Sequence, residues 1–245
     1  MLNQPPAYSF HDPTVRANFS QKVFSILSIQ LFFTFLVTWA ARTIPQVGFT
    51  LLHIFDYYST LILILIFGSL IIISLSEYCR KTYPWNYGLL SVFTVLMGSL
   101  ASLGTLMYDT DVVLVTLSLC LVIMVGLALS VKTTRYDFTS WQPALIGCLT
   151  VIVLTPLLGY FFGLYISETV MAGVSSILFV GYLASDLQMI MSGNHKYQVG
   201  LDDEVMASLI LYLDFMNLFL NLLKLIQKFK DKNSDSDKDS KKKKE

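Results

Sequence analysis

Charged side chains are scarce in this chain. They make up 14% of its 245 residues, whereas 54% of the residues are hydrophobic. A soluble globular domain carries about 25% charged residues, and the uncharged runs here reach the roughly 20 residues that a bilayer-spanning helix needs. No stretch outside these runs is long enough to build a water-soluble core. The composition therefore excludes a soluble protein and predicts a polytopic membrane protein.

Cysteines and catalytic motifs are also few. The three cysteines, Cys79, Cys120 and Cys148, form neither a CxxC pair nor a disulfide framework. The three histidines fall in separate expected loops, so metal catalysis has no support. No GxSxG, HExxH or P-loop pattern is present, which disfavours a protease or an ATP-driven pump. We expect no enzyme activity, no cofactor and no binding to nucleic acid.

Seven apolar segments are joined by short loops that carry turn and charge signals. They do not alternate polar and apolar residues as barrel strands would, so the expected fold is all-α. Pro156, followed by Gly159 and Gly163, predicts a kink or break in the fifth segment. The segments are Val23–Ala41, Tyr57–Ser76, Trp85–Met107, Val112–Val131, Trp141–Ser167, Thr169–Met191 and Val205–Leu223.

The loop charges predict the orientation in the membrane. Seven basic residues fall on the side of the N-terminus and Arg42 alone on the other, so the N-terminus should be cytosolic. Seven crossings would then put the C-terminus outside, although its tail carries nine lysines from Lys224 to Lys244. Either the seventh segment re-enters without crossing, or the tail violates the rule; Asp214 in the middle of that segment favours re-entry.

Three regions are expected along the chain. Residues 1–21 form a polar cytosolic segment, residues 22–226 the transmembrane domain, and residues 227–245 a charged tail that should be disordered. The lysines of the tail would attract anionic lipid. Lys242 and Lys243 stand fourth and third from the end and resemble a dilysine retrieval signal, which works only on a cytosolic tail.

Two acidic residues lie inside apolar segments, Asp186 in the sixth and Asp214 in the seventh. A carboxylate at the centre of a span costs about 2.5–3.5 kcal/mol on insertion scales, which makes such a residue a functional candidate. Their distances from the connecting loop, roughly 9 and 15 Å, differ by about one helical turn, so they are expected to pair. Two close carboxyl groups in a low-dielectric site titrate as one unit and can sense protons near neutral pH. When both are ionised, they offer oxygen ligands for transient Ca²⁺ binding.

Neighbouring polar residues are candidates to support this pair. Within one helical turn of the two aspartates lie Gln188, Asn217 and Tyr212. The alternative to a pair is that such neighbours form hydrogen bonds with each aspartate separately. Glu77 follows the end of the second segment. The simpler interpretation is an ion pair with Arg80 at the membrane interface, with i,i+3 spacing; the alternative is that Glu77 lines the vestibule of an ion pathway.

Four stretches resemble the Bax-inhibitor family, specifically its Lifeguard branch, and the likeness extends over about residues 14–228. The resemblance implies a seven-helix fold with the last helix central, a Ca²⁺ leak whose opening depends on pH, and suppression of stress-induced cell death. The paired aspartates of the family map onto Asp186 and Asp214, although the usual Tyr-Asp-Thr-Gln motif reads Ser-Asp-Leu-Gln at residues 185–188. The stretches are Val15–Leu31, Tyr83–Asn86, Lys132–Thr139 and Leu211–Asp214.

The expected function is therefore a pH-sensitive Ca²⁺ leak channel in the endoplasmic reticulum or Golgi membrane that protects against cell death. Its expected partners are the lipid bilayer, Ca²⁺, H⁺ and cell-death regulatory proteins. Three alternatives remain open at this point: an anti-apoptotic interaction protein without transport activity, a Ca²⁺/H⁺ exchanger, and a seven-helix receptor.

Overall fold

The computed structural model describes residues 13–134, 136–162, 167–191 and 203–242. Seven helices are long and apolar enough to cross a membrane, and the described residues contain no strand. The predicted all-α polytopic fold is confirmed. The elements are α1 (Pro13–Thr43), α2 (Pro45–Leu75), α3 (Glu77–Lys81), α4 (Trp85–Thr105), α5 (Thr110–Thr133), the 3₁₀ helix η1 (Phe138–Trp141), α6 (Gln142–Phe162), α7 (Glu168–Met191) and α8 (Glu204–Lys242).

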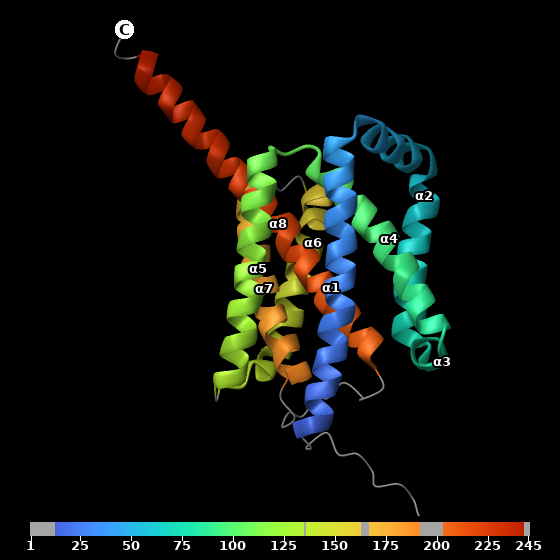
Figure 1. The fold of residues 1–245 in the computed structure, drawn as a ribbon. Helices are drawn as coiled ribbons and strands as arrows, with labels where there is room; N and C mark the ends of the chain where they lie inside the picture. The colour runs from blue at the N-terminus through green and yellow to red at the C-terminus, as the bar shows by residue number, and fades with distance from the viewer. Residues whose placement is uncertain (1–12, 135, 163–166, 192–202, 243–245) are drawn as a thin grey trace, which may run out of the picture.

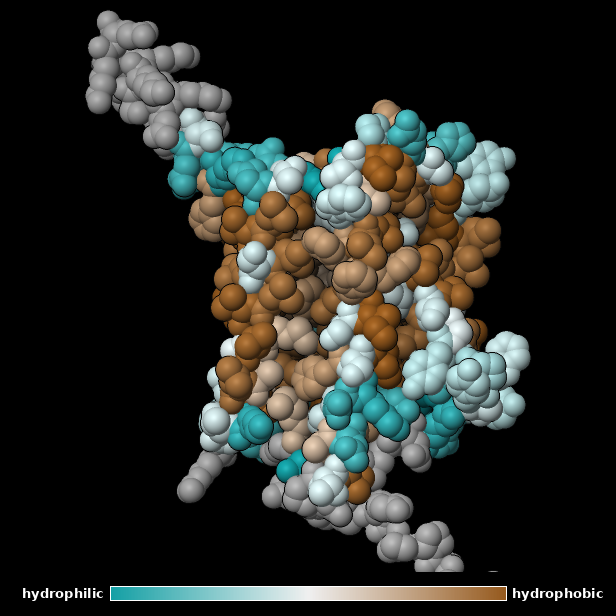
Figure 2. All heavy atoms as spheres, viewed as in Figure 1, coloured by the Kyte–Doolittle hydropathy of each residue, from teal (hydrophilic) through white to brown (hydrophobic). Residues whose placement is uncertain are grey.

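The helices form a bundle with two distinct ends. We call the end at which α1 and α8 begin and α7 finishes the lower end, and the opposite one the upper end (Figure 1). Between them, the visible face is a hydrophobic band, with hydrophilic residues gathered at both ends (Figure 2). This pattern is the one expected of a bundle whose outer side chains face lipid.

Helix α8 passes from the lower end to the upper end without a break (Figure 1). The re-entrant alternative for the seventh segment is therefore wrong: the polar Asp214 is accommodated because α8 is surrounded by other helices rather than by lipid. The first described residues and the end of α8 consequently lie at opposite ends of the bundle.

The helix also continues through residue 242, where a disordered tail from residue 227 was expected. The stretch contains neither proline nor glycine, and contacts at its base support the helix. Gln227 donates to Asp231 one turn later at 2.9 Å, and the Lys230 ammonium lies 2.8 Å from a carboxylate oxygen of both Asp109 and Asp111. The predicted boundary at residue 226 thus falls inside a helix. Lys243 and the other residues beyond 242 lie outside the described chain, as do residues 1–12, Arg135 and Lys196.

Two helices begin earlier than the hydrophobic runs indicated. Helix α1 starts at Pro13, so the second half of the expected polar N-terminal segment is helical, and Phe19 within it is buried. Helix α2 starts at Pro45 and bends at Tyr58, whose φ and ψ of −110° and 19° are not helical. Its first half lies across the upper end and its second half descends along the edge of the bundle beside α4 (Figure 1). Hydropathy detected only the descending half because the first half mixes polar and apolar residues.

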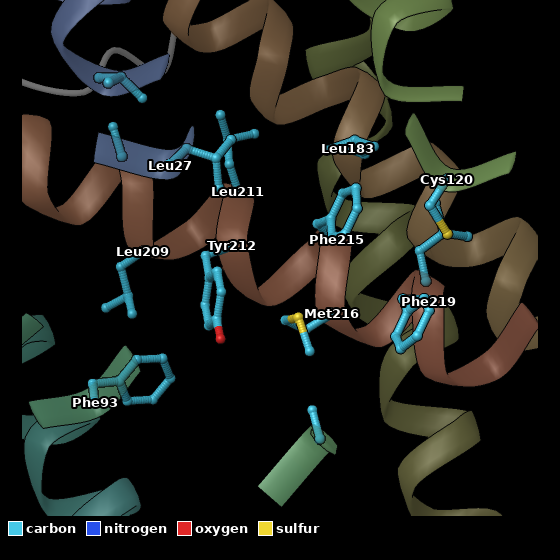
Figure 3. Packing of buried hydrophobic residues seen from close by; sticks show 14 of the residues in the cluster. Leu27, Phe93, Cys120, Leu183, Leu209, Leu211, Tyr212, Phe215, Met216 and Phe219 are labelled. Atoms are coloured by element: carbon cyan, nitrogen blue, oxygen red, sulfur yellow. The ribbon is translucent and has the colours of Figure 1, made fainter. Parts of the chain in front are cut away.

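Helix α8 forms the centre of the bundle, as the family resemblance implied. It packs against α7, α1, α5 and α4, and hydrophobic residues around its whole circumference are buried. A helix that is apolar all round is stable only when its neighbours enclose it. Figure 3 shows four of these residues, Tyr212, Phe215, Met216 and Phe219, extending from α8 toward the surrounding helices.

Buried polar side chains tie α1 to α4 and α8. The Gln30 amide donates to Thr94 Oγ1 at 2.8 Å, and the hydroxyls of Thr34 and Tyr212 are 2.8 Å apart. Gly98 permits this close approach, since a Cβ atom there would lie 2.8 Å from Thr34 Oγ1. Small residues at such contacts are typical of helix packing in membranes.

Helix α6 packs less tightly than the other spans. It contacts mainly α7 and η1, and Leu145 is its only buried residue among those described. The helix runs through Pro156, where a kink or break was expected; Gly163 lies outside the described residues. The loose packing of α6 leaves room for the cavities described below.

Candidate functional site

Helices α7 and α8 bring the two intramembrane aspartates together, as their spacing from the connecting loop predicted. Asp186 is 4% exposed and Asp214 7% exposed. Their carboxyl groups are within hydrogen-bonding reach of each other. We refer to Asp186 and Asp214 as the aspartate pair.

The aspartate pair has no cationic partner among the described residues. Asp214 Oδ2 is buried and has no hydrogen-bond donor within the described part of the chain. Two bare carboxylates repel each other, whereas one shared proton allows one carboxyl group to donate to the other. The geometry therefore suits a pair that holds a proton, or a cation, between its two members.

Gln142, the first residue of α6, holds Asp186 in place. Its Nε2 atom donates to Asp186 Oδ1 at 2.9 Å and to Ser185 Oγ at 2.9 Å. Asp186 thus accepts from a neutral donor and does not stand alone in an apolar site. Gln142 could not be recognised from the sequence, because a glutamine at the start of a helix carries no signal of its own.

Tyr182 is the second residue that the sequence analysis missed. It lies one helical turn before Asp186 and lines the inner cavity together with Asp214. The Tyr182 hydroxyl is buried and has no hydrogen-bond partner among the residues that the structure describes. The i−4 spacing from Asp186 was the available signal, since residues four apart share a helix face.

Two cavities lie between α6, α7 and α8. The inner cavity, of about 460 Å³, is lined by Asp214 and Tyr182 together with Ser175, Asn217 and Asn221. The upper cavity, of about 740 Å³, extends to Glu168, Lys224 and Lys228 near the upper end. Both are lined by Ile152, Ser175 and Asn221, so the two spaces adjoin. Together they reach from the upper end to the aspartate pair.

Asn217 lies in the same cavity as Asp214, whereas Gln188 forms its contacts elsewhere. Asn217 lines the inner cavity beside Asp214, and its Nδ2 atom donates to the Leu213 carbonyl at 2.8 Å, which leaves the amide oxygen for the cavity. Gln188 instead forms hydrogen bonds with the backbone of the connection between α5 and α6. Its Oε1 atom accepts from the Phe138 N–H at 2.6 Å, and its Nε2 atom donates to the Tyr136 carbonyl at 2.7 Å.

Tyr212 is directed away from the aspartate pair. Its hydroxyl meets Thr34 on α1, and its ring packs edge-on against Phe93 on α4 (Figure 3). Two residues along a helix correspond to a rotation of about 200°, so Tyr212 faces the opposite side of α8 from Asp214. Its expected role in supporting the pair is wrong, and it serves to pack α8 into the bundle.

Glu77 lies at the lower end and is largely exposed. Its carboxylate pairs with Lys81 at 2.7 Å, one helical turn later, and this contact holds the pKa of Glu77 below its usual range. Arg80, its expected partner, instead pairs with Asp203 at 2.7 Å. Arg80 therefore joins α3 to the residue that precedes α8, in a contact whose side chains are 18% and 13% exposed.

The architecture agrees with a known family. Residues 16–231 match the family model described as "Inhibitor of apoptosis-promoting Bax1". Protein LIFEGUARD 2 of Arabidopsis thaliana is 31% identical, with 91% of this chain and 94% of the relative covered. Protein lifeguard 3 of Homo sapiens is 27% identical, with 88% and 70% covered, and Bax inhibitor 1 of Schizosaccharomyces pombe is 28% identical, with 87% and 77% covered. The chain is therefore a multi-pass membrane protein of the Bax inhibitor and lifeguard family, a family of anti-apoptotic membrane proteins.

Proposed function

We propose that this protein is a passive Ca²⁺ leak channel of an intracellular membrane, in which the proton content of the aspartate pair controls opening. By lowering the Ca²⁺ content of the store, it would protect the cell against stress-induced death. The observation that carries the proposal is the contact between two buried carboxyl groups that have no cationic partner in the described chain. Such a contact depends on its proton count, because removing the shared proton replaces a hydrogen bond by repulsion.

The two adjoining cavities supply a route to the pair from the upper end. Below the pair, Gln142 bonds to Asp186 and Gln188 bonds to the backbone of the α5–α6 connection. A change in the contact between Asp186 and Asp214 would separate α7 from α8 below the pair, and the route would then continue to the lower end.

The inner cavity offers hard oxygen ligands of the kind that Ca²⁺ prefers. Asn217 and Asn221 both direct their amide nitrogens to backbone carbonyls of α8, at 2.8 Å in each case. Their amide oxygens are therefore the atoms left to face a cation, together with the Asp214 carboxyl group. Ca²⁺ takes six to eight oxygens, so water would complete the shell of an ion that is held only transiently.

Flux measurements on the purified full-length protein in liposomes test this proposal. With a Ca²⁺ dye inside, no ATP and the same pH on both sides, wild-type protein should pass Ca²⁺ at a rate that varies with pH. Asp214→Asn should make that rate nearly independent of pH, because an amide cannot exchange the shared proton. Asp231→Asn is the matched control, since it makes the same chemical change at an exposed position of α8 and should leave the pH profile intact.

Three results would contradict the proposal. An unchanged pH profile in Asp214→Asn would remove the pair from the gating mechanism. Flux only against an opposing proton gradient would identify a Ca²⁺/H⁺ exchanger. No flux in correctly folded wild-type protein would leave an anti-apoptotic interaction protein, in which the aspartates serve packing alone.

We further propose that the lower end faces the cytosol and that the membrane is the endoplasmic reticulum or Golgi. In the described chain before α8, the lower end carries five basic residues, Arg16, Lys22, Arg80, Lys81 and Lys132, and the upper end carries Arg42 alone, in agreement with the excess of basic residues on cytosolic loops. The lysines at the end of α8 run against this rule. Because α8 crosses fully, this orientation places the lysine-rich end on the other side, where no cytosolic receptor reads a dilysine signal. Protease-protection of tags fused to the two termini tests this: the N-terminal tag should be cleaved in sealed microsomes and the C-terminal tag protected.

A further inference from the structure

Two lysines line the upper cavity without a counter-charge of their own. Lys224 and Lys228 lie one turn apart on α8, and both belong to the wall of the cavity. Neither ammonium group has a hydrogen-bond or ion-pair partner within the described part of the chain. Both side chains are exposed, so a ligand can reach them.

The remaining charges nearby leave the mouth of the cavity positive. Glu168, at the start of α7, is the one acidic residue among the lining residues of this cavity. Asp109 and Asp111 lie at the same end, but both form ion pairs with Lys230, at 2.8 Å in each case, and so do not neutralise Lys224 or Lys228. Two lysines therefore face one carboxylate, which gives a net attraction for an anion.

Part of the remaining cavity wall is apolar, although Thr155, Ser175, Asn221 and Gln227 also line it. Ile152 and Pro156 of α6 and Met171 and Ala172 of α7 form this apolar part. Because α6 packs mainly against α7, the space beside it is accessible from the bilayer. A volume of about 740 Å³ lies within the roughly 300–1,000 Å³ of typical ligand pockets.

We propose that the upper cavity binds an anionic phospholipid, whose headgroup phosphate lies between Lys224 and Lys228 and whose acyl chain covers the apolar wall. The two lysines follow Leu222 and Leu223, the last buried apolar residues of α8, in a stretch that mixes apolar and charged residues. This is the level at which the headgroups of a bilayer lie. On the cytoplasmic side of membranes, basic pockets between transmembrane helices bind anionic headgroups, and the same pairing of ammonium groups with a phosphate would hold a headgroup at the upper end. A soluble phosphate would satisfy the lysines but would leave the apolar wall uncovered.

The binding site adjoins the route to the aspartate pair. Asn221 is one turn below Lys224 on α8 and lines both cavities. A bound headgroup would therefore lie above the inner cavity and neutralise the positive charge at its mouth. Lipid binding itself does not depend on whether the protein conducts Ca²⁺, so it can be tested without measuring flux.

Native mass spectrometry of the full-length protein in a neutral detergent tests the proposal. Phosphatidylglycerol and phosphatidylcholine of the same chain length are titrated in parallel, and bound lipid is counted. Phosphatidylglycerol should bind more tightly, and Lys224→Gln or Lys228→Gln should each weaken its binding by roughly fivefold, the usual contribution of one lysine. Lys232→Gln is the matched control, because Lys232 is an exposed lysine of the same helix outside the cavity wall, and should bind as wild type does.

The charge-retaining variant Lys224→Arg guards against a folding defect, since it should retain the preference for phosphatidylglycerol. Equal binding of the two lipids by wild-type protein would overturn the proposal, as would equal weakening by Lys232→Gln. Displacement of phosphatidylglycerol by inorganic phosphate at comparable concentration would also overturn it, because the site would then recognise a soluble anion.

Discussion

Replacing Gln142 by leucine should shift the pH dependence of Ca²⁺ flux upward. Gln142 Nε2 donates to Asp186 Oδ1 at 2.9 Å, and a donor in this position favours the ionised form of the carboxyl group that accepts it. A hydrogen bond is worth about 1.5–3 kcal/mol to a charged group and about 0.5–1.5 kcal/mol to a neutral one, so the ionised form gains about 1–1.5 kcal/mol more from Gln142 than the protonated form does. Since 1.36 kcal/mol corresponds to about one pH unit, the midpoint of the flux profile in liposomes should rise by about one pH unit, whether flux increases or decreases with pH.

Gln188→Leu provides the matched control for this experiment. It makes the same chemical change in a buried glutamine that also forms two hydrogen bonds, at 2.6 and 2.7 Å, but to the backbone of the α5–α6 connection. It should lower the thermal unfolding temperature while leaving the midpoint in place. The reasoning is refuted if Gln142→Leu leaves the midpoint unmoved, or if both variants shift it equally.

Three further predictions concern other contacts. Tyr182→Phe should alter the pH profile of flux without lowering the unfolding temperature, because it removes a buried hydroxyl that bonds to no protein group; an unchanged profile would mean that this hydroxyl plays no part in gating. Gly98→Ala should destabilise the protein by about 1–3 kcal/mol through its clash with Thr34, whereas Gly88→Ala in the same helix, with nothing within 4 Å, should be neutral or stabilising in thermal unfolding. Arg80→Gln should cost about 2 kcal/mol, between the values for exposed and buried ion pairs, and an unfolding temperature equal to that of wild type would contradict this.

Hydropathy was sufficient to predict the seven spans, because the bilayer imposes a length on every uncharged run. It could not predict where helices continue beyond the bilayer. Residues 13–22 of α1, the first half of α2 and the end of α8 are helical although they are polar or mixed. Their helical state follows from local contacts, such as those of Lys230 with Asp109 and Asp111, which hydropathy does not register.

The aspartate pair could be identified because acidic residues inside spans are rare and costly. Gln142 and Tyr182 could not be identified as surely, because neutral polar residues are common in helices and the sequence does not give the rotation of one helix against another. Tyr212 was misassigned for a reason that helical geometry already contains: two positions from Asp214 is nearly the opposite face.

The central position of α8 has a consequence for how this protein is made. The helix that fills the middle of the bundle is the last one to leave the ribosome, so the six earlier spans reach the membrane before their shared packing partner exists. During that interval Asp186 has no Asp214 to meet, and the inner faces of α1, α4, α5 and α7 have no α8 to cover them. Assembly of the bundle must therefore wait until α8 has been made, and a chain truncated before residue 204 lacks the central helix that the other spans pack against.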